Sequence, residues 1–432
     1  MKPRPLSSVA AAVGGERTGD DVDVSSVTTD SRQAGPGALF VALEGERTDG
    51  HRFVPDALAR GAAAVLVRNA ADERRRFDGT VVAIAGANGK TSTKDMTAAV
   101  VSTRFRAHAS PGSFNNEVGV PLTFLGARPD TEVIVAELGA RRAGDVTVLM
   151  PIARPNVVVI TNVGVAHMEI FGSWDVIVGA SAEPVDAIDP DGVLVLNADD
   201  PVVAGFAGRA HARVVTFGRS EEADVRADEV RIEIDGRPTF DLVAGDGRER
   251  VMLAVPGEHM VSNALAAAAV GVELGIPLEA CAEALARARV SRWRMETFET
   301  PEGILVINDA YNANPESMAA ALKAATLMAG DGRVVAVLGH MAELGDIAPE
   351  EHERVGELAA RLGVDRLITV GTEAKSIAVA GLREGFEPDA VASYDDVEAA
   401  LEDVRTHARG GDLVLVKGSR VVGLETLAEA LR

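Results

Sequence analysis

The sequence predicts an α/β protein with three domains: a small N-terminal α/β domain, a central domain with a mostly parallel sheet of the P-loop type, and a C-terminal Rossmann-like α/β domain. The length of 432 residues accommodates about three domains of ~150 residues each. Short apolar runs alternate with helical patterns over most of the chain, which is typical of parallel sheets covered by helices. In addition, a strand, a glycine turn and a helix follow one another at residues 80–97.

The segment 80–97 reads TVVAIAGANGKTSTKDMT and begins with a predicted strand. Val81–Ala85 is apolar, rich in β-branched residues and short enough for a buried strand. The chain then turns through Gly86–Gly89 and enters a helix predicted over 94–101. The candidate N-cap residues of this helix are Thr91, Ser92 and Thr93.

This arrangement predicts a binding site for a nucleotide phosphate. Backbone N–H groups of the turn and the positive end of the helix dipole face an anion there. Lys90 can reach the β- and γ-phosphates, and the hydroxyl of Thr91 can ligate Mg²⁺. The strict P-loop pattern has a glycine five positions before Gly89, where this chain has Ile84, so the motif is a shortened variant. The alternative is a glycine turn with an accidental Gly-Lys-Thr, but the strand and helix context favours the phosphate loop.

Composition excludes several classes of protein. The 43 Lys and Arg residues against 65 Asp and Glu residues give a net charge of −22, and no basic patch suited to nucleic acid is present. The single cysteine, Cys281, lies in an apolar helical pattern that indicates a core residue. No run resembles a signal peptide or approaches the ~18 apolar residues of a membrane span. We therefore expect a cytoplasmic protein without membrane insertion.

The N-terminal part, 1–78, is expected to be a domain of its own. Two runs, 37–45 and 62–67, predict strands, and 54–60 predicts a helix between them. The charged segment 72–78 is the candidate linker to the central domain.

The central part, 79–299, places polar residues just past the ends of predicted strands. In parallel sheets ligands bind beyond the carboxyl ends of the strands, so Gly86, Glu137 and His167 can share one site. Thr91, Glu137 and His167 would offer Mg²⁺ a hydroxyl, a carboxylate and an imidazole; one histidine is unusual but workable when phosphate oxygens complete the shell. Taken singly, Glu137 would be a surface carboxylate and His167 a loop histidine. The strands are predicted at 132–136, 156–161 and 192–196.

The remaining runs predict a change in topology and then a second α/β unit. Residues 213–255 consist of short alternating runs that indicate a β-meander or a small antiparallel sheet inside or beside the central domain. An alanine-rich helix follows within 257–275. Residues 300–432 form the C-terminal α/β unit, with a helix beginning at 316. Its predicted strands are 304–307, 334–339, 366–371 and 412–418.

Three motifs in this order resemble the Mur ligases, the ATP-dependent enzymes that build the peptide of the bacterial cell wall. They are GANGKT at 86–91, NVGVAH at 162–167 preceded by Glu137, and GEHMVSN at 257–263. The resemblance covers nearly the whole chain and implies ATP and Mg²⁺ as cofactors. It implies that Glu137 and His167 bind metal, Asn263 contacts adenine, Arg294 contacts the ATP phosphates and Asp309 contacts the ribose. The implied residues of the ATP loop are Gly86, Asn88, Gly89, Lys90, Thr91 and Ser92.

Four tracts are similar to the members of the family that add D-alanyl-D-alanine to UDP-N-acetylmuramoyl-tripeptide through an acyl phosphate. They are 113–125, 308–318, 339–345 and 417–420, and the D-N-P-R motif of the members that add a diamino acid is absent. The resemblance implies a monomer with a UDP-substrate domain at 1–78, an ATP domain at 79–299 and a dipeptide domain at 300–432. Lys90, His167 and Arg294 would be catalytic. The implied substrate-binding residues are Asp30, Ser31 and Arg32, which alone indicate only a turn, and Asn115, Asn116, Asn312, Asn314 and Lys417.

One position departs from the family. Mur ligases usually carry, shortly after the histidine, a lysine that is carbamylated and holds a second Mg²⁺; this chain has Ser181 there, and Met260 replaces a common asparagine. The second metal would then be absent, weaker, or held by Glu183 or water. The alternatives are another Mur-type or folylpolyglutamate-type amide ligase, or a module that binds ATP without catalysis.

Overall fold

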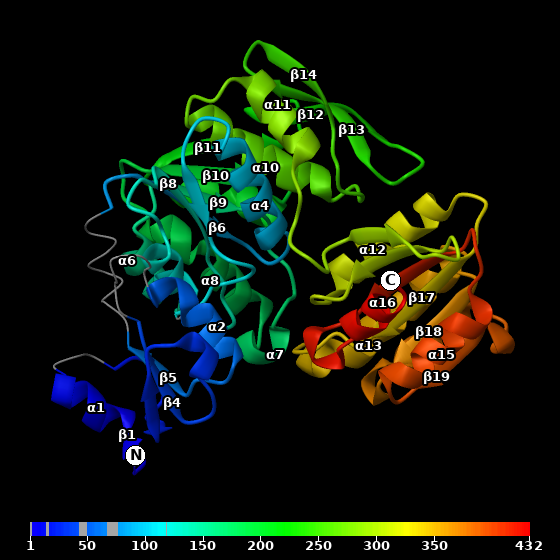
Figure 1. The fold of residues 1–432 in the computed structure, drawn as a ribbon. Coiled ribbons are helices and arrows are strands. Elements are labelled where there is room, and N and C mark those ends of the chain that lie inside the picture. The colour runs from blue at the N-terminus through cyan, green and yellow to red at the C-terminus, as the bar shows by residue number, and fades with distance from the viewer. Residues whose placement is uncertain (1, 14–16, 43–49, 67–76, 118) are drawn as a thin grey trace.

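A computed structural model describes residues 2–13, 17–42, 50–66, 77–117 and 119–432. Two large sheets organise the described chain: a nine-stranded sheet in the central part and a six-stranded sheet in the C-terminal part. Figure 1 shows the N-terminal part in blue, the central part in cyan and green, and the C-terminal part in yellow to red. Among these residues no helix is both long and apolar enough to cross a bilayer. The predicted α/β class is confirmed.

The N-terminal part is a small three-stranded parallel sheet of β3 (Ser26–Thr28), β4 (Ala38–Val41) and β5 (Ala64–Leu66). Its core joins β4 and α2 to Leu122 and Leu125 of α5, so this part packs directly on the central domain. Residues 43–45 and 67 of the two predicted strands, and 72–76 of the predicted linker, lie outside the described residues. The other elements are β1 (Arg4–Pro5), α1 (Leu6–Val13), β2 (Asp23–Val24), the 3₁₀ turns η1 (Ser31–Gln33) and η2 (Gly50–Phe53), and α2 (Val54–Ala59).

The central sheet has the strand order β14-β13-β12-β11-β10-β9-β6-β8-β7. Alternate residues of β6 (Thr80–Ala85) face two cores: Val82 and Ile84 pack against α4 and α10, and Val81 and Ala83 pack against α5, α6 and α8. This period of two explains why the strand is apolar throughout. The parallel strands beside β6 are β7 (Ala107–Ala109), β8 (Val133–Glu137), β9 (Val157–Ile160), β10 (Val193–Asn197) and β11 (Arg213–Gly218).

Helices cover both faces of this sheet. On one face the alanine run of α10 is completely buried, which confirms the helix predicted there, and Cys281 of α11 lies in the same core. Burial raises the pKa of the Cys281 thiol to about 11. The helices are α4 (Lys90–Val101), α5 (Gly119–Leu125), α6 (Asp145–Ala153), α7 (Met168–Phe171), α8 (Trp174–Ala187), α9 (Pro201–Gly205), η3 (Phe206–Arg209), α10 (Met260–Glu273) and α11 (Leu278–Arg287).

The meander predicted for 213–255 is correct only in part. β12 (Val225–Ile232), β13 (Pro238–Ala244) and β14 (Gly247–Met252) form antiparallel hairpins, but they extend the central sheet. β11 is parallel to β10, and β12 is parallel to β11. Alternating hydrophobicity reports which face of a strand is buried and does not report its neighbour, so this pairing was not readable from the sequence.

The C-terminal sheet has the order β15-β16-β20-β17-β18-β19, with β15 antiparallel to β16 and the other pairs parallel. Because β15 (Glu296–Glu299) belongs to this sheet, we propose that the limit between the second and third domains precedes Glu296. The other strands are β16 (Leu305–Asp309), β17 (Val334–Gly339), β18 (Arg366–Val370), β19 (Val391–Tyr394) and β20 (Leu413–Lys417). The helices are α12 (Pro315–Ala329), α13 (Ala348–Arg361), α14 (Lys375–Glu384), α15 (Val397–His407) and α16 (Glu425–Ala430), with the short turns η4 (Gly345–Ile347), η5 (Thr372–Ala374), η6 (Pro388–Ala390) and η7 (Arg420–Val422).

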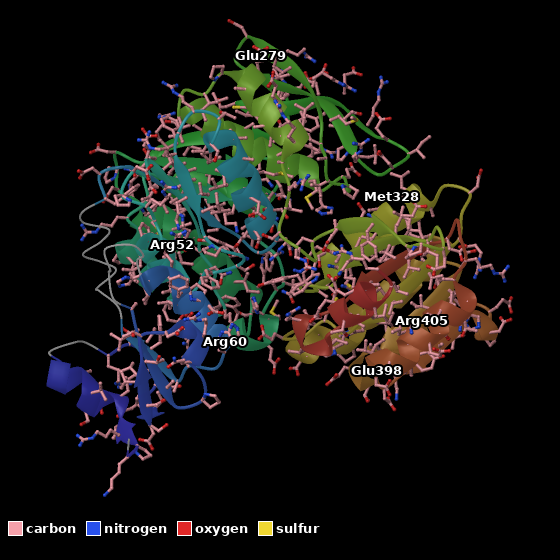
Figure 2. All side chains as sticks on the ribbon, in the orientation of Figure 1. Arg52, Arg60, Glu279, Met328, Glu398 and Arg405 are labelled. Carbon is pink, nitrogen blue, oxygen red and sulfur yellow. The ribbon has the colours of Figure 1, made fainter. Side chains whose placement is uncertain are left out.

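The acidic excess lies on the outside of the molecule. Figure 2 shows charged side chains over the outer helices, with Glu279 at the upper edge and Glu398 and Arg405 on the C-terminal domain. All three are exposed. The net charge of −22 is therefore solvated surface, and a bound anion depends on the few cations inside the molecule.

Candidate active site

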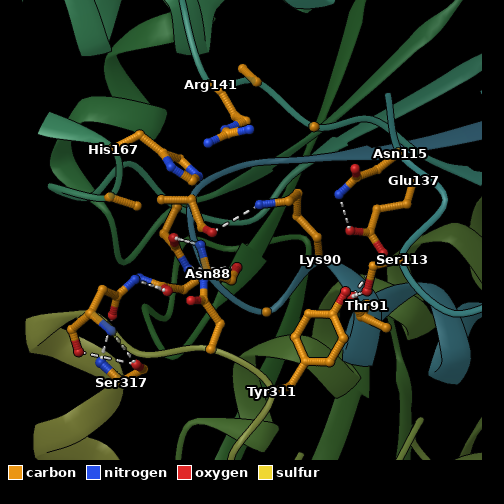
Figure 3. Close-up of a pocket in the computed structure, with 18 of the residues that line it drawn as sticks. Asn88, Lys90, Thr91, Ser113, Asn115, Glu137, Arg141, His167, Tyr311 and Ser317 are labelled. Carbon is orange, nitrogen blue, oxygen red and sulfur yellow. Dashed lines mark hydrogen bonds between the residues drawn. The ribbon is translucent and has the colours of Figure 1, made fainter. Parts of the chain in front are cut away.

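A cleft of about 1150 Å³ lies where the carboxyl ends of the central strands meet the C-terminal domain. The central domain contributes the loops after β6, β7, β8 and β9, and the C-terminal domain contributes the loop after β16 and the start of α12. Figure 3 shows the part of this cleft around Lys90. Fifteen of the predicted site residues line it: Asn88, Gly89, Lys90, Thr91, Ser92, Asn115, Asn116, Glu137, His167, Asn263, Arg294, Asp309, Asn312, Asn314 and Lys417.

The phosphate loop needs both of its glycines. Gly86 has φ +126, and a Cβ there would lie 2.2 Å from Thr161 Oγ1. Gly89 has φ +78 and is the N-cap of α4, which begins at Lys90. The predicted caps Thr91, Ser92 and Thr93 are instead buried in the first turn of the helix. A left-handed glycine cap turns the chain without a side chain, which leaves the helix N-terminus open toward the cleft.

Lys90 is held over the loop that precedes it. Its Nζ donates to the carbonyl oxygens of Gly86 at 2.7 Å and Ala87 at 2.9 Å. Burial lowers the pKa of Lys90; attraction to Glu137 opposes this shift, and repulsion from Arg294 adds to it. The ammonium is therefore positioned at the centre of the loop, where phosphate oxygens are expected.

Glu137 is a buried carboxylate bound by neutral donors. Thr91 Oγ1 donates to its Oε2 at 2.8 Å and Asn115 Nδ2 donates to its Oε1 at 2.8 Å. Ser113 Oγ lies 3.1 Å from Thr91 Oγ1 and accepts from Arg294 at 3.1 Å. Glu137 is 1% exposed, and within the described part of the chain it forms no ion pair shorter than 4.0 Å. A buried carboxylate in this situation is suited to a cation.

His167 lies on the other side of Lys90 from Glu137 (Figure 3). It has φ +61 and is the N-cap of the short helix α7. Its Nδ1 donates to Glu343 of the C-terminal domain, which also accepts from Arg141. Burial lowers the pKa of His167, and the hydrogen bond to Glu343 opposes this shift. Among the described residues no three His, Cys, Asp or Glu side chains form a metal cluster, so the predicted trio does not form a closed ligand set.

Arg294 enters the cleft from the connection between the two domains. Its guanidinium stacks on the ring of Tyr311 at 4.1 Å from the centroid. The flanking residues Trp293 and Met295 have φ +61 and +51. The carboxylate of Asp309 accepts from the N–H of Met295 at 2.9 Å and so fixes this unusual backbone.

Lys417 and Asn314 have structural partners within the cleft. Lys417 is 2% exposed and donates to Asp309 Oδ2 at 2.5 Å and to the carbonyl of Asn312 at 3.0 Å. Asn314 caps α12, and its Nδ2 donates to Asn88 Oδ1 of the phosphate loop. These contacts shape the loop after β16 and join it to the phosphate loop.

Asn263 and Asn116 also have partners in the cleft. Asn263 accepts from Thr93 Oγ1 at 3.2 Å and donates to the sulfur of Met260 at 3.4 Å. The side chain of Asn116 accepts from the N–H of Gly119 at 2.8 Å. Their predicted ligand contacts stay predictions.

The polar cluster at Asp30, Ser31 and Arg32 does not line this cleft. Asp30 caps a short turn and binds Arg32 at 2.8 and 2.9 Å. The sequence interpretation of this cluster as a turn is therefore correct for its local structure, and its predicted UDP contact stays a prediction.

Ser181 lines a small cavity of about 40 Å³ together with Lys90, His167 and Gly86. Glu183, the alternative ligand considered for a second metal, is not directed there. Its carboxylate accepts from the N–H groups of Gly144 at 2.6 Å and Thr147 at 2.9 Å at the start of α6. That alternative is wrong because the N-terminus of a helix already occupies the carboxylate.

Sequence reasoning missed four residues of this region: Ser113, Arg141, Tyr311 and Glu343. Three of them belong to tracts that the sequence had singled out, at 113–125, 308–318 and 339–345. Position within such a tract was the available signal. It did not reveal the partners, since each contact joins residues far apart in the chain.

Comparison with known proteins identifies the family. The model of the Mur ligase family, catalytic domain, matches residues 23–109; that of the Mur ligase middle domain matches 84–271; and that of the Mur ligase, glutamate ligase domain, matches 293–420. A relative from Mycobacterium tuberculosis, UDP-N-acetylmuramoyl-tripeptide–D-alanyl-D-alanine ligase, is 41% identical over 467 residues, covering 94% of this chain and 92% of the relative. The chain belongs to the Mur ligase family.

Solved Mur ligases share the architecture. MurF from Acinetobacter baumannii superimposes with a TM-score of 0.78 at 31% identity, covering 100% of this chain and 99% of that one. MurF ligase from Thermotoga maritima, solved in complex with ADP, has a TM-score of 0.76 at 29% identity, covering 94% of this chain and 96% of that one. The predicted three-domain fold and the family resemblance are confirmed.

Lys90→Ala is expected to lower turnover roughly 10²–10³-fold, because it removes a charge directed at the transferring phosphoryl group. Lys375→Ala, which removes an exposed lysine paired with Asp395, is the matched control and is expected to keep wild-type turnover. Phosphate release by the purified variants measures both, and calorimetry checks that they remain folded. Equal turnover of the two variants would contradict the phosphate-loop assignment.

Proposed function

We propose that this Mur ligase joins D-alanyl-D-alanine to UDP-N-acetylmuramoyl-tripeptide with hydrolysis of ATP to ADP and phosphate. The single observation that carries the proposal is the near full-length similarity to the M. tuberculosis ligase of that activity, 94% of this chain at 41% identity. The cleft supports it because a phosphate loop on one side faces the polar loop after β16 on the other.

The reaction begins with a poor electrophile, the terminal carboxylate of the tripeptide. A carboxylate oxygen attacks the γ-phosphorus, the bond from that phosphorus to the β-phosphate bridging oxygen breaks, and ADP leaves an acyl phosphate. The amine of D-alanyl-D-alanine then attacks the acyl carbon, phosphate departs, and the amine releases its proton to solvent. Lys90 and Arg294 neutralise negative charge on the phosphoryl oxygens, and Arg294 is oriented for this by Tyr311 and Ser113.

Thr91 and Glu137 fit Mg²⁺ and would hold it. Their oxygens lie 2.8 Å apart, Glu137 is buried without an ionic partner among the described residues, and phosphate oxygens and waters complete such a shell. When bound, the ion neutralises charge on the β- and γ-phosphates. His167, on the far side of Lys90, would serve a second position facing the transferred group.

The three domains divide the substrates between them. We propose that the N-terminal domain binds the UDP moiety near Asp30–Arg32, the central domain binds ATP, and the C-terminal domain binds the dipeptide near Asn312 and Asn314. Holding the acyl phosphate and the amine in one water-poor cleft makes their reaction effectively intramolecular. We propose a monomer because each proposed catalytic group comes from one chain.

Phosphate release is expected only when ATP, a UDP-muramoyl tripeptide and D-alanyl-D-alanine are all present. The tripeptide is supplied with lysine and with diaminopimelate at its third position, and glutamate or a single D-alanine replaces the dipeptide as a control. Release with glutamate alone would favour a folylpolyglutamate-type ligase, and no release under any condition would favour an ATP-binding module.

Glu137→Ala is expected to raise the Mg²⁺ concentration for half-maximal activity about 10–100-fold, because it removes the only carboxylate beside Thr91. Glu132→Ala, at the exposed other end of β8, is the matched control. A magnesium titration of phosphate release compares them. Overlaying curves for Glu137→Ala and wild type would move the metal site elsewhere.

The wild-type chain is expected to be insensitive to bicarbonate, because Ser181 cannot form a carbamate. Ser181→Lys reaches into the small cavity beside His167 and is expected to gain bicarbonate-dependent activity, whereas Ser181→Ala is expected to stay insensitive. Activity is measured after removal and return of bicarbonate. Bicarbonate-dependent activity of the wild type would show that a lysine elsewhere in the chain takes this role.

A further inference from the structure

Glu343 connects the C-terminal domain to His167. It lies in the loop between β17 and η4, and its two carboxylate oxygens accept from Nδ1 of His167 and from Arg141 of the central domain. The backbone carbonyl of Glu343 also accepts from the N–H of Glu169 at 3.1 Å. Three contacts from one residue thus cross the boundary between two domains.

The loop that carries Glu343 is built closely against the central domain. Glu343 has φ +63, an uncommon conformation for a residue with a side chain. Two residues on, Gly345 has φ +59, and a Cβ there would lie 3.1 Å from Glu169. Such backbone conformations persist where surrounding contacts hold them, and here those contacts come from the other domain.

The contact determines which nitrogen of His167 can bind a ligand. A carboxylate only accepts, so Nδ1 carries the hydrogen and Nε2 carries the lone pair. Within the described part of the chain Nε2 has no hydrogen-bond partner, and the imidazole lines the main cleft. Histidines that bind metals or phosphoryl groups are commonly oriented in this way by a second-shell carboxylate.

We propose that Glu343 is a positioning residue that orients His167 for the reaction only when the C-terminal domain is docked on the central domain. The carboxylate reaches His167 from a separate domain, so separation of the domains removes the acceptor from Nδ1. Docking would thereby complete the catalytic side chain and close the cleft in one step. This inference rests on the proposed function for its kinetic part alone.

The chain contains a matched control pair. His340, in the same 339–345 tract, forms an ion pair with Glu373 at 3.3 Å, and Glu373 is 72% exposed. Both partners belong to the C-terminal domain, so Glu373→Ala removes a His–Glu contact without affecting the boundary between domains. Glu343→Ala removes the contact that crosses it.

Two measurements test the proposal. The first is ¹⁵N NMR of histidine-labelled protein, in which the eight histidines include His167, assigned with His167→Ala. Glu343→Ala is expected to shift His167 from the Nδ1–H form toward a mixture of tautomers, whereas Glu373→Ala leaves it unchanged. An unchanged His167 signal in Glu343→Ala would overturn the proposal whatever the enzyme catalyses.

The second measurement is a double-mutant cycle on turnover and on the affinity for Mn²⁺ in the presence of a non-hydrolysable ATP analogue. Glu343→Ala and His167→Ala are each expected to lose about 10–100-fold in one or both quantities, and the double variant is expected to lose no more than the worse single variant. Independent, multiplying losses would show that Glu343 is only a docking contact. A wild type without substrate-dependent phosphate release would contradict the proposed function and leave the NMR result to decide this inference.

Discussion

The hydrogen bond between Thr91 and Glu137 joins the two structural features on which the cleft depends. Thr91 is in the first turn of α4, and Glu137 is the last residue of β8, so the bond ties the N-terminus of a helix to the carboxyl end of a strand. It forms because β6 and β8 are parallel neighbours whose ends reach the same edge of the sheet. The phosphate loop, the carboxylate and the loop bearing Ser113 are assembled around this pair.

Buried lysines hold the loops around that pair in place. Lys94 of α4 is 1% exposed and donates to the carbonyls of Ser110 at 2.7 Å and Gly112 at 2.6 Å, which orients the chain leading to Ser113. Lys417 does the same for the loop after β16 through Asp309 and Asn312. Burying a charge is costly unless it is paired and hydrogen-bonded, and both lysines meet that condition. The structure therefore uses paired buried cations as scaffolding, while Lys90 and Arg294 face the cleft.

The C-terminal domain supplies what the central sheet lacks. Arg294 reaches the cleft from a connection with two left-handed residues, and Glu343 reaches His167 from a separate loop. Both depend on contacts between domains: Asp309 holds the Arg294 backbone, and Arg141 and Glu169 hold Glu343. A catalytic centre divided in this way is complete only in the docked arrangement, which suits a reaction with a water-sensitive acyl phosphate.

The sequence alone determined the α/β class, most of the strands and the phosphate loop, because these follow from local patterns: apolar runs of strand length, glycines before Lys90, and polar residues after strands. It also placed Glu137 and His167 at one edge of the sheet. Tertiary structure decided the rest. The pairing of β11, the helix cap at Gly89, the separation of Glu137 from His167 by Lys90, and the commitment of Glu183 to α6 each depend on neighbours distant in the chain. The partners of Arg294 and His167 come from another domain, and no periodicity within one segment encodes a contact that forms only when two domains pack together.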